Sequence, residues 1–313
     1  MESNAPPNKV IPNIPLNTRW ALNGVTIVGG HGLGNTINQL ESPRGLFVAD
    51  DQTVVIADSY NNRIIQWKLG DADPRVVVGN RDEKHRLDQL YGPTDVLIDK
   101  NTDSLIVCDN GNQRVLRWCH QSKTTQGEIL LNNIHCWGLA MDDQRYLYIS
   151  DTDKHEVRRY GIEDKDGTVV AGGHGKGDDL NQLNSPTYIF VDRQQAVYVS
   201  DWKNHRVMKW DKDATEGTVV AGGHGQGKTL KQLSSPTGLF VDMLNTIYVA
   251  DGGNHRVIRW PKGAIRGTII VSENGCGKGA NQLWNPMGLS FDRHGNLYVV
   301  DWGNHRVQRF SKL

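Results

Sequence analysis

The decapeptide "DWKNHRVMKW" at 201–210 returns as "DGGNHRVIRW" at 251–260 and as "DWGNHRVQRF" at 301–310. Looser copies open at three earlier aspartates: "DSYNNRIIQW" at 58–67, "DNGNQRVLRW" at 109–118 and "DTDKHEVRRY" at 151–160. The intervals between successive aspartates are 51, 42, 50, 50 and 50 residues. A nearly fixed spacing of this length indicates a repeat architecture in which each copy is one supersecondary unit.

Each copy contains four short apolar runs. The aspartate ends a β-branched and aromatic run such as "VYVSD" at 197–201, and a run such as "YIFVD" at 188–192 precedes it. The second half of the decapeptide and a following "GTVVAGG" at 217–223 supply the other two. Runs of this composition, bounded by turn residues, predict strands. Four strands per unit in six units predict an all-β fold, a six-bladed β-propeller of four-stranded blades.

The two ends of the chain are expected to share a blade. The last copy stops at "RVQRFSKL" (306–313) after three runs, whereas "GVTIVGG" at 24–30 stands alone and matches the fourth run of later copies. We predict that residues 24–29 complete the last blade alongside Val307–Phe310, because the ring would otherwise keep unpaired strand edges. The predicted domains are a flexible, proline-rich lead-in over residues 1–17 and one propeller domain over residues 18–313.

The decapeptide resembles the NHL repeat. The resemblance rests on its Asn-His core followed by Arg or Glu, and on an upstream proline-glycine strand such as "SPTG" at 235–238. Six periodic copies carry it over residues 24–313. It implies a six-bladed propeller closed by its terminal strands, with one face presented to a protein or nucleic-acid partner.

The conserved spacing of the decapeptide residues predicts structural roles for them. The aspartate carboxylate can accept backbone N–H bonds across the turn into the third strand. The arginine five residues later can pair with that carboxylate or with the neighbouring blade. The third copy has Glu156 in place of this arginine. The structural aspartates are Asp58, Asp109, Asp151, Asp201, Asp251 and Asp301.

Two motifs suggest ligands that their context argues against. "GGHGQGKT" at 222–229 matches a phosphate-binding loop, but such a loop needs a helix after it, and "LKQLSSPTG" leads into a strand instead. Histidine recurs at 155, 205, 255 and 305. Adjacent blades hold such rings about 10 Å apart, whereas zinc binds nitrogen at about 2.1 Å. We therefore predict neither a metal site nor a cofactor.

Charge and cysteine content limit the partners and the compartment. Lys+Arg and Asp+Glu both number 35, which argues against nucleic acid and against membranes as partners. Cys108, Cys119, Cys136 and Cys276 form no CxxC pair, so we expect thiols in a reducing compartment rather than a disulfide framework. The expected state is a monomer in the cytosol, with Ser311-Lys312-Leu313 offering a peroxisomal address as an alternative.

The copies differ most where they face the central channel. The regular "SPTG" becomes "SPRG", "GPTD", "HCWG", "SPTY" and "NPMG" in the other blades, and aromatic residues follow three of the repeat aspartates. An arginine, a carboxylate, a histidine and aromatic rings at one mouth can form a ligand pocket. Ordinary divergence of a loop face remains an alternative. The predicted site residues are Arg44, Tyr60, Asp95, His135, Trp137, Tyr188, Trp202, Met287 and Trp302.

Two classes of function fit this prediction. The first is a binding or scaffold module that presents the channel mouth to a protein, a peptide or a small ligand. The second is a hydrolase or lyase of the lactonase or amidating-lyase type, because those enzymes resemble NHL proteins in fold. Those enzymes use a zinc held by three histidines or a carboxylate-rich calcium centre, whereas only His135 and Asp95 lie at the mouth here. His135 with Asp95 or Tyr188 could still perform acid–base catalysis.

Overall fold

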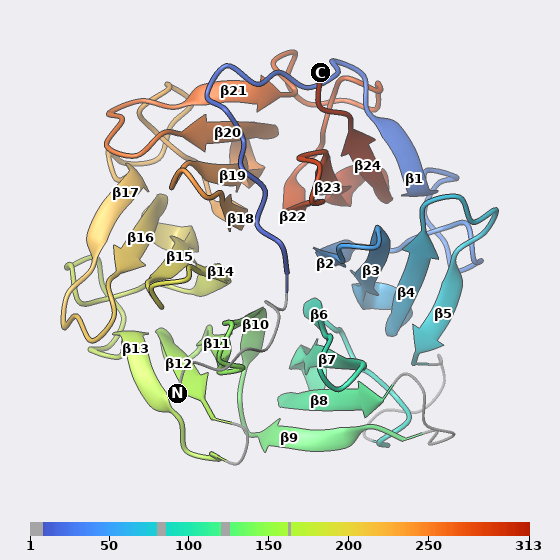
Figure 1. Ribbon diagram of the computed structural model, residues 1–313, viewed down its shortest axis with the longest axis horizontal. Coiled ribbons are helices and arrows are strands. Elements are labelled where there is room, and N and C mark those ends of the chain that lie inside the picture. Colours follow the sequence, from blue (N-terminus) through green and yellow to red (C-terminus); the bar gives the residue numbers. More distant parts are fainter. Residues whose placement is uncertain (1–8, 80–85, 120–125, 162–163) are drawn as a thin grey trace.

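The computed structural model describes residues 9–79, 86–119, 126–161 and 164–313. It shows six four-stranded antiparallel sheets arranged as a ring of blades (Figure 1). Blades 1 to 3 consist of β2 (Pro43–Val48), β3 (Thr53–Asp58), β4 (Arg63–Lys68) and β5 (Arg75–Val78); β6 (Asp95–Asp99), β7 (Ser104–Asp109), β8 (Arg114–Cys119) and β9 (Glu128–Asn132); and β10 (Cys136–Met141), β11 (Leu147–Asp151), β12 (Glu156–Tyr160) and β13 (Thr168–Gly172).

Blades 4 to 6 repeat the same order. They consist of β14 (Pro186–Val191), β15 (Val197–Asp201), β16 (Arg206–Trp210) and β17 (Thr218–Gly222); β18 (Pro236–Val241), β19 (Ile247–Asp251), β20 (Arg256–Trp260) and β21 (Thr268–Val271); and β22 (Pro286–Phe291), β23 (Leu297–Asp301), β24 (Arg306–Phe310) and β1 (Val25–Gly29). The six-bladed β-propeller predicted from the sequence is confirmed. No helix among the described residues has the length and apolar character needed to cross a membrane.

The ring closes as predicted, through β1 on the outer edge of the last blade. β1 pairs antiparallel with β24, and Val25 lies opposite Arg309 and Val28 opposite Val307. The sheet order is β1-β24-β23-β22, so the first and last strands of the chain lie side by side (Figure 1). Backbone hydrogen bonds therefore latch the ring, and β1 covers the edge of β24 that would otherwise be unpaired.

The core lies between neighbouring blades. Tyr148 of blade 3 belongs to one apolar cluster with Val199 and Met208 of blade 4, and equivalent clusters fill the other wedges. The last aromatic residue of the decapeptide lies within this layer, and Trp210, Trp260 and Phe310 are almost fully buried. Both faces of a blade are covered by its neighbours, which explains why its strands are apolar on both faces.

In five blades the repeat aspartate joins three segments of its own blade. The carboxylate of Asp201 accepts the side-chain N–H of Arg206 at 2.8 Å and the backbone N–H of Asn184 at 2.7 Å. Arg206 in turn donates to three carbonyls of the loop before the blade, at 2.7–3.2 Å. The expectation of backbone bonds across the turn was therefore wrong for these blades. Side chains such as Asn204 and Arg206 donate across the turn instead, and the backbone N–H comes from a residue 17 positions earlier.

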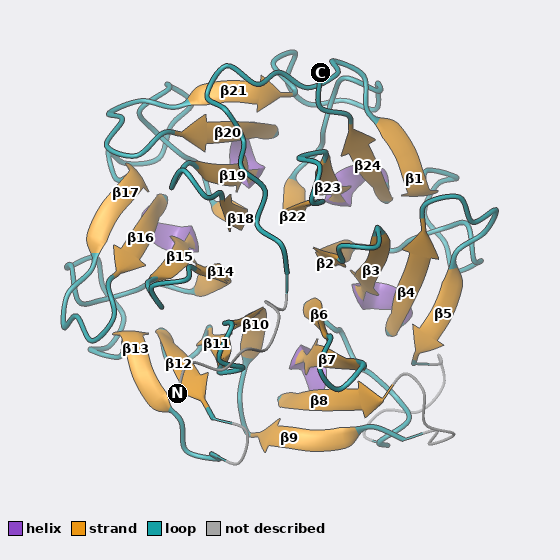
Figure 2. Ribbon diagram, viewed as in Figure 1, coloured by secondary structure: helices purple, strands orange, loops and turns teal. Residues whose placement is uncertain are grey.

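Blade 3 is the exception that the sequence indicated. Asp151 accepts the backbone N–H groups of Asp153 and Lys154, both at 3.0 Å, so here the bond across the turn is present. Glu156 cannot replace the arginine, and it pairs with Arg158 instead. The other five turns contain a short 3-10 helix, which blade 3 lacks: η1 (Ser59–Asn61), η2 (Asn110–Asn112), η3 (Trp202–Asn204), η4 (Gly252–Asn254) and η5 (Trp302–Asn304). Figure 2 shows these helices in purple.

In four blades the repeated histidine links its blade to the next one. His205 adopts a left-handed backbone with φ of 54°, and its ring Nδ1 accepts the N–H of Ser235 at 3.0 Å. His155, His255 and His305 make the same bond to the following blade, and the last of these crosses the ring closure. In blade 1 the side chain of Asn62 replaces the ring, since it accepts the N–H of Gly92 at 2.9 Å. The position is therefore structural.

The glycine-rich loop at 222–229 is also part of the repeat. No helix follows it, and residues 230–235 lead directly into β18. Gly222, Gly223 and Gly225 have φ of 72°, 77° and 75°, and the loops at 172–175 and 29–32 repeat these values closely. The glycines are needed for a turn with a left-handed backbone.

The lead-in packs against the ring over its described part, residues 9–17. Ile14 is fully buried among residues of blades 5 and 6. Further along, the Trp20 indole N–H donates to the Gly295 carbonyl at 2.9 Å. Figure 1 shows this blue segment crossing the front of the ring from the rim to the centre. The predicted flexible lead-in thus has an ordered second half.

Candidate functional site at the channel

The channel is bounded by the innermost strand of each blade. These strands are β2, β6, β10, β14, β18 and β22 (Figure 1). In four of them the fourth residue of the "SPTG"-type segment is glycine, namely Gly45, Gly138, Gly238 and Gly288. A Cβ atom on Gly238 would lie 2.3 Å from the Met287 carbonyl oxygen, so adjacent inner strands meet at this level without room for a side chain. Blades 2 and 4 have Asp95 and Tyr188 at the same position.

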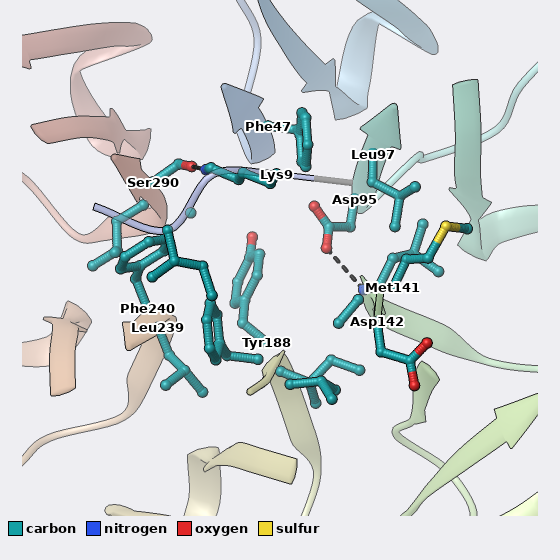
Figure 3. A pocket seen from close by; sticks show the side chains of 18 of the residues that line it. Lys9, Phe47, Asp95, Leu97, Met141, Asp142, Tyr188, Leu239, Phe240 and Ser290 are labelled. Atoms are coloured by element: carbon teal, nitrogen blue, oxygen red, sulfur yellow. Dashed lines mark hydrogen bonds between the residues drawn. The ribbon is translucent and has the colours of Figure 1, made fainter. Parts of the chain in front are cut away.

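Asp95 is a buried carboxyl group bonded to two backbone amides. One oxygen accepts the N–H of Val96 at 3.0 Å, and the other accepts the N–H of Leu139 in blade 3 at 2.9 Å (Figure 3). Burial raises the pKa of Asp95 to about 7, although both amide bonds act to lower it. The group can therefore exchange a proton close to neutrality.

Tyr188 is buried beside Asp95, and its hydroxyl group makes no hydrogen bond of normal geometry. Burial raises the pKa of Tyr188 well above its ordinary value of 10.0, and the negative charge of Asp95 raises it further. The positive charge of Arg44 and a weak contact of the Trp137 indole N–H with the Tyr188 hydroxyl both lower this pKa. The residues that shift the pKa of Tyr188, together with Tyr188 itself, therefore come from blades 1, 2, 3 and 4. We name Arg44, Asp95, Trp137 and Tyr188 the mouth cluster.

Arg44 and Trp137 close the top of this cluster. The Arg44 guanidinium lies 4.8 Å from the centroid of the Trp137 ring, within the range of a cation–π contact. The two residues come from blades 1 and 3, so the pair bridges over blade 2, which carries Asp95. Arg44 Nε and Trp137 Nε1 are buried without a hydrogen-bond partner, as is the Tyr188 hydroxyl. An unpaired buried polar group costs about 1–3 kcal/mol.

The remaining predicted residues lie in three different surroundings. Met287 is buried in an apolar cluster against which both Trp137 and Trp302 pack. Met287 and Trp302 therefore lie next to the mouth cluster. Tyr60 and Trp202 are 61% and 37% exposed on η1 and η3, where they face solvent. His135 pairs with Asp153 of its own blade at 3.3 Å. The acid–base partnership suggested for His135 with Asp95 or Tyr188 therefore has no contact to support it.

The sequence did not reveal the other end of the channel. There Lys9 of the lead-in donates to the Ser290 hydroxyl, and its ammonium group lies 5.1 Å and 5.2 Å from the ring centroids of Phe47 and Phe240 (Figure 3). Loss of water around this amine lowers its pKa to about 7, although the carboxylates of Asp50 and Asp292 raise it. We name Lys9, Phe47, Phe240 and Ser290 the far-end cluster.

A cavity of about 130 Å³ connects the two ends. Asp95, Tyr188 and Lys9 all line it (Figure 3). Its wall between them is formed by one apolar side chain from each inner strand: Leu46, Val96, Leu139, Ile189, Leu239 and Leu289. The channel is therefore a narrow apolar space with a polar group at either end.

A disulfide lies directly behind the mouth cluster. Cys108 of β7 and Cys136 of β10 are fully buried, and their Cα atoms are 5.7 Å apart. The expectation of thiols was wrong for this pair, since the ring brings two residues 28 positions apart together across blades 2 and 3. Cys119 and Cys276 are exposed thiols. The cysteine argument for a reducing compartment no longer applies to the bonded pair.

The described residues offer no donor set for a metal. Within residues 9–79, 86–119, 126–161 and 164–313, no three side chains of His, Cys, Asp or Glu are grouped so that they could hold an ion. The zinc and calcium centres of the enzymes named above therefore have no matching set of residues in this part of the chain.

Comparisons with known proteins agree with the fold. The NHL repeat family model matches residues 283–310. An auxiliary nutrient binding protein from Bacteroides thetaiotaomicron has 14% identity and a TM-score of 0.68, over 98% of this chain and 76% of that one. A gluconolactonase from Xanthomonas campestris has 13% identity and a TM-score of 0.66, over 100% and 99%.

A third solved structure is an inactive virginiamycin B lyase from Staphylococcus aureus, with 11% identity and a TM-score of 0.59, over 94% of this chain and 99% of that one. A search of the curated proteins found no significant match. Identities this low show a shared fold, and that fold hosts binding proteins and enzymes alike. The chain is a six-bladed β-propeller that carries an NHL repeat in its last blade.

Proposed function

We propose that this propeller is a binding module whose mouth cluster holds an oxygen-bearing group of a small ligand or of a peptide. The observation that carries the proposal is the convergence of three buried polar atoms without partners, on Arg44, Trp137 and Tyr188. All three carry an N–H or O–H that can donate. Buried polar groups are normally paired, so three without a hydrogen bond of normal geometry in one cluster favour a site for an acceptor.

The chemistry of the donors favours a carboxylate. A guanidinium binds carboxylate oxygens more strongly than neutral ones, and the indole N–H can donate but cannot accept. These atoms are covered in the closed arrangement, so the Trp137 ring has to move aside when the ligand enters. The apolar cavity beneath the cluster then accepts the nonpolar part of the ligand.

The enzymatic alternative rests on Asp95. A carboxyl group with a pKa of about 7 can accept or donate a proton at neutral pH, as general acid–base catalysis requires. The lyase and the gluconolactonase show that this fold occurs in enzymes as well. The alternative predicts turnover in a screen of lactones and esters, and loss of that turnover in Asp95→Asn.

The binding proposal is tested with benzoate as the probe and benzamide as its neutral counterpart. In protein labelled with ¹⁵N at tryptophan, benzoate is expected to shift the indole N–H resonance of Trp137, which Trp137→Phe identifies. Benzamide should shift it far less. Arg44→Ala and Tyr188→Phe should weaken benzoate binding about tenfold, which corresponds to the loss of one hydrogen bond to a charged group.

Trp202→Phe is the matched control, because Trp202 is an exposed tryptophan of the same repeat. It should leave benzoate binding unchanged. Equal shifts with benzoate and benzamide, or no shift of the Trp137 resonance, would contradict the proposal.

We also propose an intracellular monomer. The C-terminal tripeptide is held in place, since the Leu313 N–H donates to the Arg19 carbonyl at 3.0 Å and the Ser311 carbonyl accepts from Ala21 at 2.8 Å. A peroxisomal receptor would first have to break these bonds. Fluorescent fusions with and without residues 311–313 test this address directly.

A further inference from the structure

The lead-in binds the channel in the manner of a peptide ligand. Residues 10–15 belong to no helix, strand or turn. The side chains of Lys9, Ile11 and Ile14 face the ring, whereas Val10 and Asn13 are exposed. The segment therefore presents a pattern of lysine, any residue, an apolar residue, proline, any residue and an apolar residue. We name residues 9–14 the strap.

Two backbone hydrogen bonds fix the register of the strap. The Val10 N–H donates to the Asp50 carboxylate at 3.0 Å, and the Pro12 carbonyl accepts the N–H of Met243 at 3.4 Å. Proline suits this position because the strap uses its carbonyl group and has no need of an N–H there. Peptides bound in extended form are recognised by such main-chain bonds together with pockets for alternate side chains.

Each inward side chain has a site built for it. The Lys9 amine lies between two phenylalanine rings and donates to Ser290. Ile14 is fully buried, and Ile11 packs against the same cluster. The Lys9 site is lined by three blades, since Phe47, Phe240 and Ser290 come from β2, β18 and β22.

The strap is held far less firmly than the closing strand. β1 forms a ladder along β24, whereas the strap has the two backbone hydrogen bonds just described. Segments with few backbone bonds open locally at a small fraction of the global unfolding free energy. When the strap leaves, the cavity of about 130 Å³ between the two clusters opens at this end.

We propose that the far end of the channel is a docking site for an extended peptide with the Lys-x-apolar-Pro-x-apolar pattern, and that the strap occupies this site as an internal competitor. The partner is a protein that exposes such a segment. The strap benefits from an effective concentration in the millimolar range, as tethered ligands do. A free peptide therefore gains access when the strap is weakened.

The test uses full-length protein and a fluorescein-labelled peptide of residues 9–16, KVIPNIPL. The double variant Lys9→Ala/Ile11→Ala removes two inward side chains from the strap, and the control Val10→Ala/Asn13→Ala removes two outward ones. Fluorescence anisotropy should show that the first variant binds the peptide at least about tenfold more tightly than the wild type and the control do. A peptide with alanine at its lysine position should bind about tenfold more weakly.

Several outcomes would overturn the proposal. A variant that melts like the wild type and does not bind the peptide would show that the site accepts only the tethered strap. Equal binding of the alanine peptide would remove the lysine site. A dimer in light scattering, lost in the double variant, would make a second copy the occupant.

Hydrogen exchange in the wild type keeps the proposal testable if the double variant does not fold. The Met243 amide, which the strap covers, should exchange much faster than the amide of Tyr248 in the central strand β19 of the same blade. Equal protection of the two would mean that the strap opens only with the whole fold, and the proposal would fail.

Discussion

The turns that carry the decapeptide and the channel that runs through the ring use charged residues in opposite ways. In the turn of blade 5, Asp251 and Arg256 are buried together, and their side chains meet at 2.7 Å. In the channel, Asp95 has only amide partners, and Arg44 lies against a ring with no carboxylate paired to it among the described residues. In five of the six turns the repeated aspartate faces an arginine, whereas Asp95 and Arg44 in the channel have no opposite charge beside them in the part of the chain that the structure describes. We assign the first arrangement to stability and propose that the second serves binding.

Removal of a repeat carboxylate is expected to have the largest effect. Asp251→Ala leaves Arg256 buried without its partner and should lower the free energy of unfolding by about 3–5 kcal/mol. Asp151→Ala in blade 3 is the matched control, because Asp151 bonds only to backbone amides, and it should cost about 1–2 kcal/mol. Urea denaturation of both variants measures the difference. Equal losses would mean that the arginine pairing adds nothing.

The unpaired carboxyl in the channel should appear as a pH dependence of stability. Asp95 binds a proton in the folded protein up to a pH of about 7, but in the unfolded chain only up to its ordinary value near 3.8. The protonated Asp95 side chain therefore contributes to the free energy of unfolding fully below pH 3.8, and this contribution, up to about 4 kcal/mol, is lost as the pH rises through 7.

Asp95→Asn should remove this slope while the buried repeat aspartates keep theirs. Urea midpoints of the wild type and the variant across this pH range provide the measurement. A difference between them that stays constant with pH would contradict the assignment.

Lys9 should make the free energy of unfolding depend on pH in the opposite direction, with the stabilising contribution present at alkaline pH. Its folded-state pKa of about 7 lies below the ordinary 10.5, so its contribution is fully present above 10.5 and is lost as the pH falls through 7. The strap can open before the protein unfolds, so we expect a change of only about 2 kcal/mol.

Lys9→Met, which keeps the length of the side chain, should abolish this change. Thermal melts at neutral and alkaline pH compare the two proteins, and a slope that survives in Lys9→Met would come from other groups. The charged residues facing this space are Asp50, Asp95, Lys100, Asp142, Asp143, Asp192, Arg193 and Asp292.

The link between blades gives the smallest expected effect. His205→Ala removes the acceptor for the Ser235 N–H and places alanine in a left-handed backbone, at a cost of about 1 kcal/mol. His205→Asn should restore most of the loss, because Asn62 performs the same role in blade 1. Thermal melts of both variants check this order. An asparagine variant no better than the alanine one would show that the ring acts through packing.

The periodic part of the molecule could be predicted from the sequence because six copies of the repeat carry the same strand pattern. The strands, the closure by residues 24–29 and the odd third blade all follow from alignment of the copies. Partners across long distances could not be predicted in this way. The carboxylate of Asp201 bonds back to Asn184, and His205 bonds forward to the next blade, because bond direction depends on how adjacent blades are placed.

The site was predictable only where a residue departs from the repeat. Asp95 and Tyr188 stand where four blades need glycine, so the sequence identified them, and the structure places them together with Arg44 and Trp137. Tyr60 and Trp202 depart from the repeat too, but they lie on exposed turns. Lys9 lies outside the repeat, and nothing in its neighbours indicates that it enters the channel. Cys108 and Cys136 likewise meet only because their blades are adjacent.

Closure of the ring by β1 and β24 also constrains the order of assembly. β1 waits for a partner strand from the sixth blade, so blades 1 to 5 can form while the ring is still open. During that interval β1 exposes a free edge, and the wedge between blades 6 and 1 is still empty. Folding of this protein is therefore complete only when its two ends meet, and any second chain that offers a matching strand before then competes with its own C-terminus.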